Sequence, residues 1–333
     1  MRAARFEGNR KVVVGSAPDP VPGRGEVLVR VDTCALCGTD RPGYLAGSEV
    51  TPGHETSGTV VGVGDEVDDD LLGARGVVYL VAACGRCYAC RRGSSNMCVY
   101  KQAMYGFTAP GGFAERVAVR ADCFLPVEDG IPLDAATALL DLYGTARHAL
   151  NRVGARRRDA LAVIGCGPIG LGVVSVARAL ETADVLAVDI EPYRLELAER
   201  LGATPVDATA GDAVAAALAP RPDGYEVVVE AAGHPATQQQ AIDMAAPGGR
   251  VAIVAHSRKP LPLDTLAGLI QKERSIVGSE YFRRDELGAN QELMLQGRLD
   301  PRPAMTHTFG LDDMQAACDA FFSGATGKVL VRP

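Results

Sequence analysis

The sequence predicts an α/β protein that joins a barrel-like, antiparallel β domain to a doubly wound parallel sheet. Two patterns predict this fold class. Through the first 120 of the 333 residues, short β-branched runs alternate with Gly- and Pro-rich turns, which is typical of antiparallel strands. From about Asp134 onward, apolar runs alternate with stretches of helical periodicity, which indicates parallel strands joined by helices.

Individual elements follow from these patterns. In the first part, β-branched runs predict strands at 12–14, 27–31 and 59–63. Apolar residues at helical spacing over 135–153 predict one helix where the pattern changes. The second part is expected to contain strands at 160–164, 185–188, 226–230, 250–255 and 275–278 and helices at 169–180 and 194–201. The tail after about Tyr281 is expected to contain a helix at 311–322 and a closing strand at 328–331.

Composition argues against a nucleic-acid-binding or membrane protein. The chain carries 34 Lys and Arg against 41 Asp and Glu, a formal net charge of −7, whereas a nucleic-acid surface is basic. The longest uncharged stretch, 160–177, is interrupted by glycines and a proline, so a strand, turn and helix explain it better than a membrane span. The N-terminus lacks the apolar core of a signal peptide, so we expect a cytoplasmic protein.

A glycine-rich turn indicates a dinucleotide site in the second part. The motif Gly165-Cys166-Gly167-Pro168-Ile169-Gly170 follows an apolar strand and opens a helix, and Asp189 ends the next strand. Such glycines let the backbone turn tightly and approach a pyrophosphate at the positive helix N-terminus. Asp189 is expected to accept hydrogen bonds from the adenosine ribose and to repel a 2′-phosphate, which predicts NAD rather than NADP. Arg194 is assigned to the same cofactor site.

Four closely spaced cysteines indicate a metal site. Cys84, Cys87, Cys90 and Cys98 lie within fifteen residues on a segment with little apolar core of its own. Four thiolates close a tetrahedral zinc shell and leave no open position, so the spacing predicts a structural zinc site. An iron-sulfur cluster is the competing interpretation, because cluster motifs also use closely spaced cysteines.

Five segments together resemble a known family over nearly the whole chain. They are, in order, CGTD at 37–40, PGHETSG at 52–58, CGRCYACRRGSSNMC at 84–98, GGFAERV at 111–117 and VIGCGPIG at 163–170, and they are similar to the zinc-dependent medium-chain alcohol and polyol dehydrogenases. The resemblance implies a GroES-like catalytic domain at 1–147 with a structural zinc lobe at 84–98. A Rossmann NAD-binding domain at 148–280 follows, and 281–333 is expected to return to the catalytic domain.

The resemblance also implies a second, catalytic zinc, giving two zinc ions per chain. Cys37 and His54 match two of its ligands, and Asp141 matches the third. Glu55 is expected beside the ion, either as a ligand or ready to displace one. Thr145, four residues after Asp141, is assigned to the cofactor site.

Further roles follow from the same resemblance. Thr39 looks like the hydroxyl that bonds the substrate oxygen and passes on its proton, and Asp40 looks like the carboxylate that orients the ligand histidine. Ile169 resembles the apolar residue behind the nicotinamide ring. Apart from the resemblance, Lys328 in the tail is a candidate to reach the pyrophosphate. Some members carry a relay histidine where this chain has Pro42, so the proton must leave by another route.

The expected function is therefore hydride transfer between NAD(H) and a secondary alcohol or ketone of small size. The chain has no tryptophan, and the polar candidates near the expected pocket are Tyr44, Ser48, Glu49, Tyr105 and Tyr143. Such a pocket favours a polyol, sugar, cyclitol or amino-alcohol substrate. Two alternatives stay open: an NADH-linked reductase of simple ketones or aldehydes, and a non-catalytic NAD- and zinc-binding protein of the same fold. The resemblance implies a homodimer or homotetramer.

Overall fold

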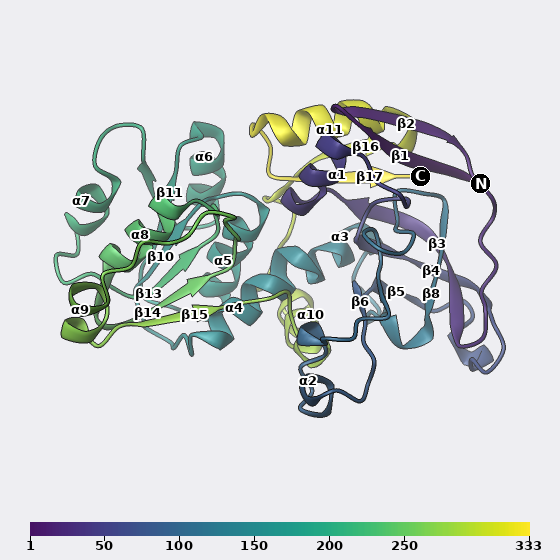
Figure 1. The fold of residues 1–333 in the computed structure, drawn as a ribbon, viewed down its shortest axis with the longest axis horizontal. Helices are drawn as coiled ribbons and strands as arrows, with labels where there is room; N and C mark the ends of the chain where they lie inside the picture. Colours follow the sequence, from purple (N-terminus) through teal and green to yellow (C-terminus); the bar gives the residue numbers. More distant parts are fainter. The chain divides into compact units, whose positions relative to one another are not determined.

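The chain forms two compact units in the computed structural model, which describes residues 1–333 (Figure 1). One unit contains 1–141, 283–295 and 305–333, and the other contains 142–282 and 296–304. The family resemblance implies boundaries after residues 147 and 280. Every helix is too short or too polar to cross a lipid bilayer.

A seven-stranded sheet organises the first unit. Its order is β16-β17-β3-β4-β5-β9, with β8 also paired to β3, and all pairs are antiparallel except β16 with β17. Two small ribbons, β1-β2 and β6-β7, accompany it. The strands are β1 Arg2–Gly8, β2 Lys11–Ser16, β3 Glu26–Ala35, β4 Glu55–Val63, β5 Arg75–Val78, β6 Val81–Ala82, β7 Ala103–Met104, β8 Arg116–Arg120, β9 Phe124–Pro126, β16 Met305–Gly310 and β17 Lys328–Arg332. The helices are α1 Arg41–Ala46, α2 Tyr88–Arg91, α3 Leu133–Ala136, α10 Leu287–Leu295 and α11 Met314–Ser323.

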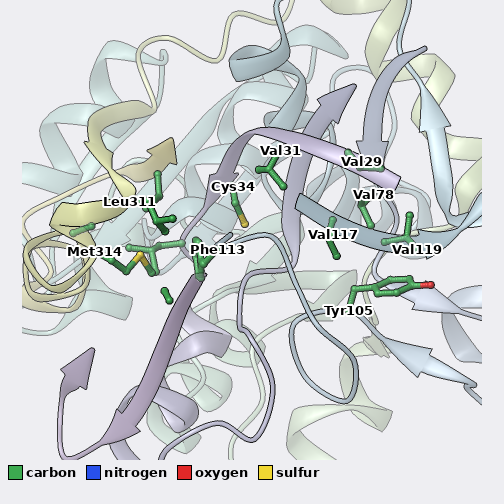
Figure 2. Close-up of a cluster of buried hydrophobic side chains, with 14 of the residues drawn as sticks. Val29, Val31, Cys34, Val78, Tyr105, Phe113, Val117, Val119, Leu311 and Met314 are labelled. Atoms are coloured by element: carbon green, nitrogen blue, oxygen red, sulfur yellow. The ribbon is translucent and has the colours of Figure 1, made fainter. Parts of the chain in front are cut away.

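The core of this unit explains why the end of the chain belongs to it. Alternate residues of β3, such as Val29 and Val31, point inward, as the two-residue period of a strand requires. Figure 2 shows these valines gathered with Phe113 and with Leu311 and Met314 from the C-terminal region. The core is therefore completed by residues that lie about 280 positions apart in the sequence.

The second unit is a six-stranded parallel sheet in the order β12-β11-β10-β13-β14-β15. Helices α4, α5 and α6 cover one face, and α7 and α8 cover the other. The chain reverses direction across the sheet between β10 and β13, so the carboxyl ends of these two strands form the switch point where such folds bind ligands. The strands are β10 Leu161–Ile164, β11 Val185–Asp189, β12 Thr204–Asp207, β13 Tyr225–Glu230, β14 Ala245–Ile253 and β15 Ser275–Gly278. The helices are α4 Ala146–Arg152, α5 Pro168–Ala179, α6 Pro192–Arg200, α7 Ala213–Leu218, α8 Pro235–Met244 and α9 Thr265–Gly268.

The predicted fold class is confirmed, but several elements differ from the prediction. The single helix expected over 135–153 is wrong, because the chain passes from α3 through a 3₁₀ turn and a π-helical turn, 141–145, before α4 begins. The elements that were not predicted include strands β12 and β16 and helices α7, α8, α9 and α10. β12 is a short edge strand that contains a proline, so its hydrophobic pattern is weak.

Candidate active site and metal centres

The pairing of β3 with β4 brings Cys37 and His54 together. Ala35 pairs with Glu55, so the residue two positions after β3 and the residue just before β4 emerge at the same end of the sheet. Gly53, beside His54, has a φ of +100°, and a Cβ there would lie 2.7 Å from the backbone nitrogen of Phe113 and 2.8 Å from Cys34 Sγ. Only glycine fits this position, so the approach of His54 to the site is fixed by the backbone.

The π-helical turn places Asp141 in the same cluster. Its Oδ2 lies 3.2 Å from Cys37 Sγ and 3.4 Å from His54 Nε2. Isolated π-turns within helices are uncommon and are frequent at functional sites, because the wider turn redirects a side chain. One potential ligand atom from each of Cys37, His54, Glu55 and Asp141 lies within 4.8 Å of the others, and all four residues are buried.

These four residues fit a divalent metal ion. Asp141 Oδ1 and Glu55 Oε2 are buried and accept no hydrogen bond, which is costly unless a cation satisfies them. Burial, together with the Asp141 carboxylate, raises the pKa of the Cys37 thiol. A nearby cation would hold that group as the thiolate, which is the form that binds zinc.

Two residues of the short 3₁₀ turn 38–40 contact His54 from different sides. The exposed Thr39 has its Oγ1 3.2 Å from His54 Nε2. The buried Asp40 accepts a 2.9 Å hydrogen bond from the Cys37 backbone N–H, and its Oδ1 lies 3.4 Å from His54 Nδ1. Asp40 is therefore placed to fix both the Cys37 backbone and the plane of the imidazole. Pro42 lies in the first turn of α1 and supplies no proton-transfer group.

Lys328, the first residue of β17, forms a buried ion pair with Glu55 in this cluster. The expectation that Lys328 contacts the pyrophosphate does not agree with this contact, because its side chain is only 1% exposed and its ammonium donates to Glu55 Oε1. Burial raises the pKa of Glu55 to about 8, although the Lys328 charge opposes the shift. No sequence pattern marks Lys328, since only the pairing of β17 with β3 brings it to the site.

The four-cysteine lobe has the spacing of a tetrahedral metal site. The Sγ atoms lie 3.9 Å apart for Cys84 and Cys90, 3.5 Å for Cys87 and Cys90, and 3.9 Å for Cys87 and Cys98. A tetrahedron with metal–sulfur bonds of about 2.3 Å has sulfur atoms about 3.8 Å apart. Hydrogen bonds from backbone N–H groups, chiefly that of Cys90, lower the pKa of the Cys87 thiol to about 6. The lobe thus fits one ion held by four thiolates.

The glycine turn between β10 and α5 has the geometry of a phosphate-binding turn. Gly165 has a φ of +92°, and a Cβ on Gly170 would lie 1.8 Å from the Gly165 carbonyl oxygen. Gly167, by contrast, has no atom within 4 Å of where its Cβ would be, so space is open there. Pro168 is at the start of α5, and Ile169 beside it is half-buried. The turn therefore requires glycine at positions 165 and 170 for its backbone geometry and packing, whereas Gly167 faces open space.

Asp189 and Arg194 lie next to this turn. Asp189, at the carboxyl end of β11, accepts hydrogen bonds from the backbone N–H groups of Cys166, Ile190 and Glu191. Arg194 Nε is buried and has no hydrogen-bond partner. The hydroxyl of Thr145, in the π-helical turn, is likewise buried and has no hydrogen-bond partner.

One acidic residue near this turn was not predicted. Glu230 ends β13 beside the end of β10, and its Oε1 accepts hydrogen bonds from the Ala232 and Gly233 N–H groups and from the Thr237 hydroxyl. Glu230 directly follows the apolar run Val227–Val229 at the end of a central strand. A charged residue in that position is the signal that could have identified it from the sequence.

Comparison with known proteins gives the same assignment along the chain. Residues 23–129 match the alcohol dehydrogenase GroES-like domain family, and residues 168–295 match the zinc-binding dehydrogenase family. L-threonine 3-dehydrogenase of Bacillus licheniformis is 32% identical, over 98% of this chain and 100% of that protein. Sorbitol dehydrogenase of Bacillus subtilis is 30% identical, over 100% of this chain and 97% of that protein.

A solved structure agrees in fold. A protein of E. coli CFT073, described as a short chain alcohol dehydrogenase complexed with NADH, superposes with a TM-score of 0.93 at 26% identity, covering 100% of this chain and 99% of that one. Both family matches and two near-complete relatives of 30% identity or more agree with the two metal-type clusters. The chain therefore belongs to the zinc-dependent medium-chain alcohol and polyol dehydrogenases and is an oxidoreductase.

Proposed function

We propose that this protein transfers hydride between NAD(H) and a small secondary alcohol or ketone whose neighbouring carbons carry polar groups. The observation that carries the proposal is the buried cluster of a thiol, an imidazole and a carboxylate, Cys37, His54 and Asp141. Three protein ligands of this kind leave one position of a zinc ion free, which is the arrangement of a catalytic rather than a structural site.

The residues of the cluster have distinct roles in this proposal. Cys37, His54 and Asp141 would hold the zinc, which supplies Lewis acidity that makes an alcohol oxygen easier to deprotonate and a carbonyl easier to reduce. Thr39 Oγ1, next to His54 Nε2, takes the proton from the alcohol oxygen and returns it in the reverse direction. Because Thr39 is exposed and Pro42 cannot relay, the proton leaves Thr39 to water.

The second unit would bind the dinucleotide, which accepts or donates the hydride. Gly165, Gly167, Pro168, Ile169 and Gly170 form the pyrophosphate turn in this proposal, and Asp189 binds the adenosine ribose. The carboxylate already accepts three N–H groups, yet its oxygens have further lone pairs for ribose hydroxyls. A 2′-phosphate would meet this buried negative charge, so the cofactor is NAD. Thr145 and Arg194, whose buried polar atoms lack partners, would hydrogen-bond the cofactor.

The substrate class rests on the relatives. They include enzymes named for an amino alcohol, threonine, and for a polyol, sorbitol. We therefore propose a polyol, sugar, cyclitol or β-hydroxy amino acid as substrate. This proposal is tested by initial rates of NADH formation with L-threonine, sorbitol, myo-inositol and 2-propanol at equal concentration. A preference for 2-propanol, or for acetone in the NADH-consuming direction, would contradict the substrate class.

We also propose a cytoplasmic homo-oligomer. None of the nine cysteines forms a disulfide bond, and each is either buried or part of the four-cysteine lobe, which suits a reducing compartment. In the second unit, β15 is an edge strand with partly exposed Ile276 and Val277, and an unpaired edge can pair with a second copy. Light scattering of the purified protein tests this, and a monomer at micromolar concentration would contradict it.

A further inference from the structure

An aromatic ring lies against the imidazole of the metal cluster. The ring centroids of Phe107 and His54 are 4.8 Å apart, and the two planes are inclined by 39°. Phe107 is 36% exposed, and a single exposed phenylalanine is ordinary by itself. What distinguishes Phe107 is the partner of its ring, a buried imidazole from the cluster that fits a metal ion.

The backbone holds this ring in place. The turn that carries Phe107 runs along the segment just before His54, and the Gly112 N–H donates to the Gly53 carbonyl at 2.8 Å. Gly106 has a φ of +85°, and a Cβ there would lie 2.7 Å from the same carbonyl oxygen. The two segments thus meet backbone to backbone, so Phe107 cannot move away from His54 without breaking this contact.

Phe107 lies on the side from which a substrate reaches the cluster. Cys37, His54 and Asp141 are each at most 6% exposed, so a molecule coming from solvent must pass the exposed groups beside them. Two exposed side chains contact His54. They are Thr39, whose Oγ1 lies 3.2 Å from Nε2, and Phe107. The approach therefore has one polar side and one apolar side.

The two sides would treat the substituents of an alcohol differently. A hydroxymethyl group placed against Phe107 would lose its water and gain no hydrogen bond, which is costly, whereas a methyl group would bury apolar surface. A larger alkyl group would need room that the fixed ring occupies. Resting on the function proposed above, we propose that Phe107 determines specificity: the carbon that is oxidised carries a small apolar substituent, such as methyl, that faces this ring, and its polar substituent faces away.

Three alcohols that differ only in their end groups test this inference. The meso forms of 2,3-butanediol, 3,4-hexanediol and erythritol end in methyl, ethyl and hydroxymethyl groups, and each offers both configurations of the carbinol carbon. They are compared by kcat/KM with NAD, or as inhibitors of the best substrate from the panel above. The parent should prefer the methyl compound by about tenfold or more, because one group in an apolar site commonly changes specificity by that factor.

Variants at Phe107 separate size from polarity. Phe107→Ala leaves space that water can fill, so the penalties on ethyl and on hydroxymethyl should each fall about tenfold. Phe107→Leu keeps a smaller apolar side chain, so it should relax the penalty on ethyl and retain the penalty on hydroxymethyl; it also serves if Phe107→Ala does not fold. Tyr100→Ala is the matched control, since Tyr100 is 69% exposed on the four-cysteine lobe, and it should leave all ratios unchanged.

A second readout needs no turnover, because the chain contains no tryptophan. Phe107→Trp introduces a single one, whose fluorescence is measured without NAD. Co²⁺ should quench this emission, and Cys37→Ser in the same protein should remove the response. With the metal bound, 2,3-butanediol should change the emission at a lower concentration than erythritol does.

Equal ratios in the parent and Phe107→Ala would overturn the inference, as would a parent that prefers the ethyl or the hydroxymethyl compound. Failure of the proposed function gives a different result. In that case Co²⁺ would leave the emission of Phe107→Trp unchanged whether or not Cys37 is present, and the inference would fall with the proposed function.

Discussion

Replacement of Asp40 by Asn tests whether the site depends on the orientation of His54. The Asp40 side chain is 1% exposed, and its two oxygens face different groups, the Cys37 N–H at 2.9 Å and His54 Nδ1 at 3.4 Å. An asparagine that keeps its oxygen on the Cys37 N–H must turn its NH₂ group toward Nδ1. The imidazole would then carry its proton on Nε2, the nitrogen next to Asp141, and a protonated nitrogen cannot bind a metal.

The expected loss of zinc affinity is large, but binding is not abolished. Changes to a residue that orients a metal-binding histidine typically lower metal affinity by about 10- to 100-fold. Such a loss corresponds to about 1.4–2.7 kcal/mol, which is comparable with one charge-assisted hydrogen bond. Asp40→Ala removes the carboxylate without supplying a donor, so it should lose less affinity than Asp40→Asn.

Zinc affinity at the Cys37 site is measured by competition with a chromophoric chelator, with kcat/KM followed in the same preparations. Far-UV circular dichroism checks that the fold is retained, and the four-cysteine lobe serves as an internal control because it lies outside the cluster. Equal zinc affinity in Asp40→Asn and the parent would show that the contact with Nδ1 has no part in metal binding, and the assigned role of Asp40 would be wrong.

Three further predictions address the two metal sites and the cofactor turn. Cys37→Ser should abolish turnover with little change in melting temperature, whereas Cys90→Ser should lower that temperature by about 5 °C or more; the opposite pattern would exchange the two assignments. Gly170→Ala places a Cβ 1.8 Å from the Gly165 carbonyl oxygen, so NADH affinity in a fluorescence titration should fall about tenfold or more, and unchanged affinity would contradict the turn geometry. Asp189→Asn should raise the ratio of kcat/KM for NADP over NAD by up to about 10³-fold, since a unit charge about 4 Å from a phosphate at an effective dielectric constant of ~20 costs about 4 kcal/mol. A ratio that does not change would remove Asp189 as the source of cofactor choice.

Much of the fold was predictable because hydrophobic periodicity is strong where strands are central. The runs ending at Ile164 and Asp189 are buried along their whole length, and both were predicted within two residues. Edge strands carry a weaker pattern, and β12, with residues that are mostly exposed, was missed for that reason. The helix predicted over 135–153 failed differently, because periodicity reports which residues are apolar and not whether the turn is α-helical or π-helical.

Some features of the site could likewise be predicted from short sequence segments, and others could not. Segments such as PGHE and GCGPIG contain their own backbone requirements, as the positive φ angles of Gly53 and Gly165 demonstrate. These segments were therefore visible in the sequence. The contact between Glu55 and Lys328 joins residues 273 positions apart and arises only when β17 adds to β3. No local motif encodes such a contact, so it required the structure.

Charge balance explains why the buried cluster needs this lysine. A thiolate at Cys37 and carboxylates at Glu55 and Asp141 carry three negative charges in a volume closed to water. A divalent ion cancels two of them, and a third left alone would be strongly unfavourable. Lys328 pairs with Glu55 and supplies the remaining positive charge, so the cluster, a divalent ion and Lys328 are together neutral.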